Sequence, residues 1–119
     1  MSARGFALDR FVCDLDVELD TGRGRVSGRG LDLRNYALVC QTKPAINPGT
    51  TVQIQLRLVL EWGTSEAFGV SGHVLWSTET EGGHQIGVLL TELLPDVRQR
   101  LDVLIRVLTG AIALPSPGR

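Results

Sequence analysis

The sequence has only two cysteines, Cys13 and Cys40, and both lie in apolar runs that predict strands. No CxxC or HxxxH spacing connects them with His73 or His84, so the usual pattern of a zinc or redox site is missing. We interpret both cysteines as buried thiols and expect no metal. The alternative hypothesis, from another class of protein, is a metal protein or small enzyme that uses Cys13, Cys40, His73 and His84.

Long apolar runs and an excess of basic charge are also missing. No run of about 18 apolar residues occurs, so no transmembrane helix is predicted. The first ten residues lack the apolar core of a signal peptide, so we expect a cytoplasmic protein. With 12 basic and 13 acidic residues, the net charge is −1, which does not favour a nucleic-acid polymer or a membrane surface as partner.

The chain has 119 residues, of which 43% are hydrophobic, and this fits one compact domain. We expect residues 1–110 to form that domain. Residues 111–119 contain two prolines and little that could pack, so we expect a tail that frays. Nothing in the sequence predicts an oligomeric state.

A glycine- and arginine-rich tract at residues 22–30 resembles the segments that some RNA-binding proteins use. Aromatic residues are not interleaved with its arginines, and the chain has no basic excess. We therefore interpret the tract as a turn followed by a strand with exposed arginines.

Apolar residues alternate with polar ones along most of the chain, which predicts strands with one buried face. In the strand expected at about residues 68–76, the alternation places Trp76 on the same face as Val70 and Val74. The expected strands cover about residues 11–19, 25–33, 37–40, 52–60, 68–76 and 86–90.

The apolar period changes to that of a helix near the end of the sequence, over about Pro95–Thr109. A proline at the first helical position and Asp96 beside it are typical of a helix start. Six strands and one amphipathic helix predict a mainly β fold: a six-stranded antiparallel barrel whose open end or side the helix covers.

The order of these elements resembles the PilZ family. The resemblance rests on the segments Gly72-His73-Val74-Leu75-Trp76 and Gly83-His84-Gln85-Ile86-Gly87-Val88-Leu89-Leu90, followed by Leu93, and it covers about residues 6–108. It implies a six-stranded barrel with a C-terminal helix, and a receptor for cyclic di-GMP that has no enzymatic activity.

Two motifs bind the nucleotide in this family, and both are altered here. RxxxR falls on residues 6–10, where Arg10 matches and Phe6 replaces the first arginine. [D/N]xSxxG falls on residues 32–37, where Asp32 matches. Arg34 replaces the serine and Ala37 replaces the glycine.

Loss of an arginine removes a contact that grips phosphate and stacks on guanine. We also expect Arg34 to pair with Asp32 and to fill the pocket. The remnant site would consist of Arg10, Asp32, Arg34 and Asn35. In the alternative interpretation, Arg10 and Arg34 form a rearranged phosphate site with Tyr36 as a stacking face.

The resemblance and the altered motifs together predict a non-enzymatic adaptor that binds cyclic di-GMP weakly or not at all. Cyclic di-GMP remains a possible ligand. We expect a protein partner and no cofactor. Degenerate members of the family serve bacterial signalling, motility and type IV pilus complexes. The alternative function is a divergent receptor that uses Arg10, Asp32 and Arg34.

Overall fold

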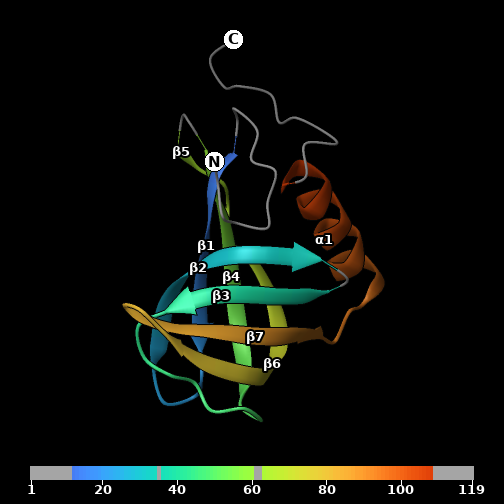
Figure 1. Cartoon of the computed structure of the whole chain (residues 1–119). Coiled ribbons are helices and arrows are strands. Elements are labelled where there is room, and N and C mark those ends of the chain that lie inside the picture. Colours follow the sequence, from blue (N-terminus) through green and yellow to red (C-terminus); the bar gives the residue numbers. More distant parts are fainter. Residues whose placement is uncertain (1–11, 35, 61–62, 109–119) are drawn as a thin grey trace.

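The computed structural model describes residues 12–34, 36–60 and 63–108. Its backbone forms seven strands and one helix (Figure 1). These are β1 (Val12–Asp20), β2 (Arg25–Arg34), β3 (Ala37–Thr42), β4 (Thr51–Leu60), β5 (Gly63–Thr64), β6 (Phe68–Thr80), β7 (Gly83–Thr91) and α1 (Pro95–Leu108).

Six of the strands close into a barrel. Their order is β1-β2-β3-β7-β6-β4, and β4 pairs back with β1 from Val12↔Leu60 to Asp20↔Gln53. All pairings are antiparallel. The predicted six-stranded antiparallel barrel is therefore confirmed.

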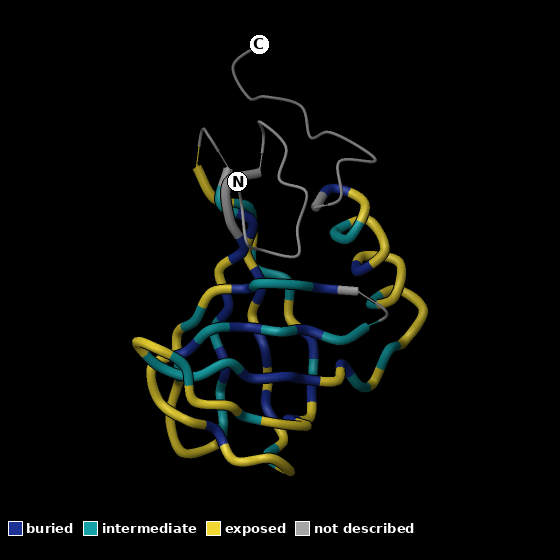
Figure 2. Tube along the Cα trace, in the orientation of Figure 1, coloured by how far each residue is buried: buried dark blue, intermediate teal, exposed yellow. Residues whose placement is uncertain are grey.

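The interior of the barrel is filled by the apolar residues of the alternating pattern. Figure 2 shows buried and exposed positions changing along each strand. Exposure falls to zero at Leu15, Leu19, Leu38 and Ile54, so side chains from β1, β3 and β4 meet in one core. The alternation predicted for the first strand is confirmed at Leu15, Val17 and Leu19, which are buried, whereas Phe11 and the side chain of Cys13 are not described.

Helix α1 lies at the end of the barrel where β2 turns into β3 and where β6 begins (Figure 1). Leu101 and Val107 are buried in the common core, and the Arg100 guanidinium lies 5.2 Å from the centre of the Phe68 ring. The prediction that the apolar stripe covers the barrel is thus confirmed. The described part of the chain contains no helix with the length and apolar character needed to span a membrane.

Two local features differ from the expectation. The segment predicted as a turn after β4 contains β5, a two-residue strand that pairs with Val59 and Leu60. In β6, the register shifts between Val74 and Trp76, which adds one residue to the strand. The bulge reverses the alternation, so the prediction that Trp76 shares the inner face of Val74 was wrong.

Close packing in the core predicts different effects for two glycines of β6. A Cβ atom at Gly72 would lie 2.6 Å from Val88 Cγ1 and 2.8 Å from Ile54 Cδ1. Both neighbours are buried, so Gly72→Ala should lower the free energy of unfolding by about 1–3 kcal/mol. Urea unfolding measures this loss.

The matched control is Gly69→Ala, on the outer face of the same strand. There the added Cβ would meet only the flexible side chain of Gln55, with Nε2 at 3.1 Å. We expect a change within about 0.5 kcal/mol. Equal losses in the two variants would contradict the packing that we describe around Gly72.

Candidate functional site

The second altered motif lies at the end of β2 and in the turn to β3. Asp32 pairs with Val39, and both point outward because the next pair, Leu33 and Leu38, is buried inside. The backbone of Arg34 lies opposite Ala37.

Several residues of the predicted site lie outside the described structure. Phe6, Arg10 and Asn35 are among them, and of Arg34 only the backbone is described. The predicted pairing of Arg34 with Asp32 therefore stays a prediction. Of the four predicted site residues, the structure describes the side chain of Asp32 alone.

Two β-bulges shape the outer face beside Asp32. One inserts Leu31 into β2, and the other inserts Leu75 into β6. Between them, the register lines up Asp32, Val39, Gly87 and Trp76 as successive neighbours on four strands. Asp32 and Trp76 are thus separated by three strand spacings, about 14 Å.

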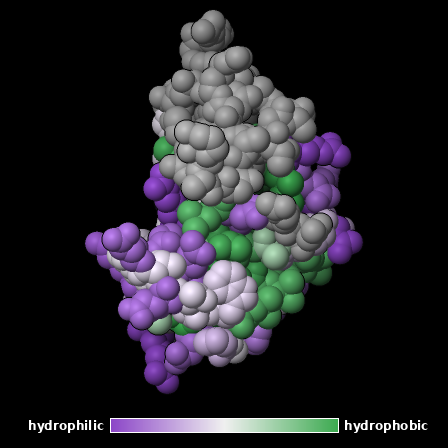
Figure 3. All heavy atoms as spheres, in the orientation of Figure 1, coloured by the Kyte–Doolittle hydropathy of each residue, from purple (hydrophilic) through white to green (hydrophobic). Residues whose placement is uncertain are grey.

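Trp76 lies flat against the barrel because Gly87 has no side chain. A Cβ atom at Gly87 would overlap Cε2 and Nε1 of the Trp76 ring. The ring stays 39% exposed, and its neighbours Leu75 and Leu89 are also exposed. Figure 3 shows apolar side chains gathered on this face, over β3 and β7. The outer face of β3, β7 and β6 is therefore an aromatic and aliphatic surface, which we call the apolar face.

The opposite side of the barrel, formed by β4, β1 and β2, is charged. Asp16 lies between Arg29 and Arg57 in the register of the three strands. Two positions further along β1, Glu18 lies 3.9 Å from Arg25 of β2. The arginines of the tract at residues 22–30 therefore occupy a turn and an outward strand face, as predicted, next to carboxylates.

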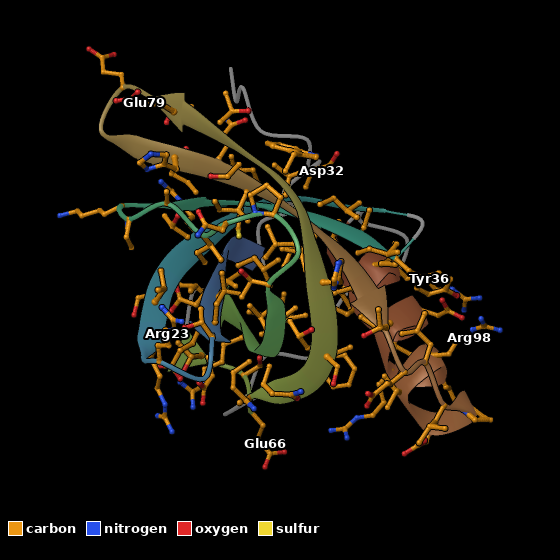
Figure 4. The ribbon with its side chains drawn as sticks, turned by 90° about the horizontal axis from the view of Figure 1, so that it is seen from below. Arg23, Asp32, Tyr36, Glu66, Glu79 and Arg98 are labelled. Carbon is orange, nitrogen blue, oxygen red and sulfur yellow. The ribbon has the colours of Figure 1, made fainter. Side chains whose placement is uncertain are left out.

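Tyr36 connects the turn of the second motif to the helix. Its hydroxyl donates a hydrogen bond to Asp102 Oδ1 over 3.0 Å, and the Arg98 guanidinium lies 5.4 Å from the ring centre. Its carbonyl accepts a hydrogen bond from the Leu90 N–H over 2.9 Å. In Figure 4, Tyr36 and Arg98 lie together, apart from Asp32. The ring thus belongs to the helix contact and not to the outer face that carries Asp32.

The backbone of this turn also departs from the expected pattern. Tyr36 has a φ of 59°, in the left-handed region that favours glycine. Ala37, which stands in place of the motif glycine, continues into β3 without a positive φ. The left-handed conformation of this turn therefore lies at Tyr36 and not at Ala37.

The described cysteine and histidine side chains are those of Cys40, His73 and His84. Cys40 is buried, and desolvation raises the pKa of its thiol to about 12, so it stays protonated. His84 Nδ1 donates to the Lys43 carbonyl over 3.0 Å, since a carbonyl only accepts. No group of metal-binding side chains occurs among the described residues. The side chain of Cys13 is not described.

An apolar groove of about 430 Å³ separates α1 from the barrel wall. Leu56, Leu58 and Phe68 line it from the strands, and Val103 and Val107 line it from the helix. The polar part of its lining comes from Ser65, Glu66, Gln99 and Arg100.

Comparison with known proteins agrees with this architecture. The model of the PilZ domain family matches residues 4–106. Among solved structures, the chain is similar to the PilZ domain of YcgR from Escherichia coli with c-di-GMP, with a TM-score of 0.61 and 12% sequence identity. The match covers 92% of this chain and 94% of that domain. Comparison with curated proteins gave no significant match. The chain belongs to the PilZ domain family.

Sequence reasoning missed two residues that shape the site. Trp76 was assigned to the inner face, because the register shift before it leaves no mark in the alternation. Tyr36 was considered as a stacking face for the nucleotide. Its link to Asp102 spans 66 positions of the chain, so only the folded arrangement reveals it.

The contact between Tyr36 and the helix can be measured directly, because Tyr36 is the only tyrosine of the chain. The hydrogen bond to Asp102 comes first among the causes that raise the pKa of Tyr36 above its ordinary value of 10.0. We expect an ultraviolet absorbance titration to give a raised pKa in the wild type. Asp102→Asn should move it back toward the ordinary value.

Asp96→Asn is the matched control, because Asp96 is an exposed carboxylate in the first turn of the same helix. It should leave the tyrosine pKa unchanged. A raised folded-state pKa also means that the folded protein holds its proton longer than the unfolded chain does. This contribution to stability should therefore fall as the pH rises above about 10. An equal shift of the tyrosine pKa in Asp102→Asn and Asp96→Asn would contradict the hydrogen bond between Tyr36 and Asp102.

Proposed function

We propose that this chain is a non-enzymatic regulatory PilZ domain that acts through protein contacts and binds cyclic di-GMP weakly or not at all. We also propose that it works in the bacterial cytoplasm, in signalling or motility, including type IV pilus complexes. One observation carries the proposal: three of the five signature positions of the nucleotide motifs are replaced, at Phe6, Arg34 and Ala37.

The expected loss of affinity follows from the chemistry of the ligand. Each phosphate of cyclic di-GMP needs cationic donors, and Phe6 supplies none. Removal of one partner from such a charged contact typically costs about 2–5 kcal/mol. This corresponds to a loss on the order of 30-fold to several thousand-fold in affinity.

The position of Tyr36 supports the same conclusion. A rearranged site would need a new face on which guanine could stack, and Tyr36 is the aromatic residue within the altered motif. Its ring contacts Arg98 and its hydroxyl binds Asp102 on α1. Stacking of a nucleotide base on the face of the ring that Arg98 covers would therefore require the contact with Arg98 to break.

Isothermal titration with cyclic di-GMP tests this proposal. For the wild type, we expect no saturable binding in the low micromolar range. Saturable low-micromolar binding would refute the loss of the site.

The triple variant Phe6→Arg, Arg34→Ser, Ala37→Gly restores both motifs on the same scaffold. It should gain binding, because it restores the missing arginine and the two small residues of the motifs. A triple variant that folds normally but stays unable to bind would show that the motif positions are assigned incorrectly.

A divergent receptor is the second candidate function, and one feature of the fold favours it. Asp32 and the exposed Trp76 share one row of the outer face about 14 Å apart, so a ligand with two bases could stack one base on Trp76 and pair the other with Asp32. In this case Arg10 and Arg34 would bind the phosphates. Arg10→Ala should then abolish nucleotide binding, and equal binding by wild type and variant would exclude this arrangement.

A further inference from the structure

Strand β6 extends past the barrel wall and leaves part of one edge free. On the side of β4, its last backbone bonds join Val74 to Gly49 and Thr50, at 2.8 and 2.9 Å. From Leu75 to Thr80, β7 is the only strand that pairs with β6 in the described part of the chain. The six-residue stretch Leu75–Thr80 is therefore a sheet edge; we call it the free edge.

Apolar side chains lie directly beside this edge. Leu75 is 50% exposed and Trp76 is 39% exposed, and the bulge that inserts Leu75 turns Trp76 to the outer surface. Further along, Thr78 and Glu79 are exposed as well. Figure 4 shows Glu79 at the projecting end of the β6–β7 hairpin, on the other side of the barrel from Tyr36 and Arg98.

Free edges of this kind are normally protected. Unpaired N–H and C=O groups in a row form a template for another strand, and proteins block them with lysine, proline, a β-bulge or a covering loop. Here the bulge lies at Leu75, the first residue of the edge, and the register with β7 is regular from Trp76 to Thr80. The free edge contains neither lysine nor proline, and Glu79 is its single charge. It therefore keeps both parts of a strand-recognition site: a row of backbone groups and, next to it, apolar anchors.

We propose that the free edge of β6 binds an extended segment of a protein partner as an added β-strand. The apolar side chains at alternate positions of the bound segment would pack on Leu75 and Trp76. The inference rests on the proposed function only in that the partner is a protein. A backbone edge selects an extended peptide segment, because only another extended backbone matches the spacing of its donors and acceptors.

The dimensions of the edge favour a partner segment over a second copy of this chain. Six residues span about 20 Å of strand. A strip of this length supplies on the order of 200 Å², whereas stable dimers bury about 800 Å² per partner. A flexible segment can pair with the edge and then continue onto the apolar face, which adds the area that self-pairing lacks.

Selection from a displayed library of short random peptides tests the inference on the full chain. We expect enriched peptides in which apolar and polar residues alternate. In two-dimensional NMR, the best of them should shift the amide signals of Leu75–Thr80. Enriched peptides that map to the groove beside α1, or that do not alternate, would overturn the proposal.

Two controls separate strand addition from ordinary apolar adhesion. A version of the best peptide with N-methyl groups on its alternate, edge-facing amides should bind at least tenfold more weakly, since it loses its donors. Leu75→Ala should weaken binding about tenfold. Leu94→Ala, the same change at a residue that is 64% exposed near α1, should not alter binding. Unchanged binding of the methylated peptide or of Leu75→Ala would refute the added strand.

Sedimentation of the protein over a range of concentrations tests the competing occupant. We expect a monomer, with no self-association that depends on Leu75. A dimer that Leu75→Ala disrupts would assign the edge to a second copy and overturn the proposal. Nucleotide binding is measured separately, so failure of the peptide selection leaves the test of the altered nucleotide site intact.

Discussion

The pairing of β1 with β4 is the constraint on which the other features depend. These strands are separated by more than thirty positions, yet their register runs from Val12↔Leu60 to Asp20↔Gln53 and closes the sheet. Closure satisfies the backbone groups of both strands and directs alternate side chains into one core. The interior is then filled, so any binding function has to use the outer faces, the ends or the hairpin that extends beyond the wall.

The turn between β2 and β3 links two such regions. Asp32 faces outward on β2, while Tyr36, four positions later, bonds to Asp102 on the helix that packs over the barrel end. Tyr36 holds a left-handed backbone conformation, which costs free energy in a residue with a side chain. Its contacts with the helix and with the Leu90 N–H offset that cost. The altered motif is therefore part of the structure that holds α1 in place.

The fold could be predicted because its main signal is periodic. Alternation along β4 and the helical period after Pro95 each identify an element without reference to the rest of the chain. Trp76 escaped prediction because a bulge is defined by the partner strand, and its single extra residue leaves the apolar pattern of β6 superficially regular. The role of Tyr36 escaped for a related reason, since its partner lies on a distant element.

The two outer faces of the barrel differ in what they can bind. Around β1, carboxylates of β1 lie beside arginines of β2 and β4, as Asp16 does between Arg29 and Arg57. On the apolar face, the row of Asp32, Val39, Gly87 and Trp76 contains one carboxylate and no cation. A ligand with two phosphates would thus depend on cations from Arg10 and Arg34.

A protein segment makes different demands on the same face. It needs apolar contacts and backbone partners, and the described residues supply both at Leu75, Trp76 and the free edge of β6. Exposed apolar surface is costly to keep in water unless a partner covers it for part of the time. The loss of the motif arginine at Phe6 and the presence of this surface both support the proposal of a domain that acts through protein contacts.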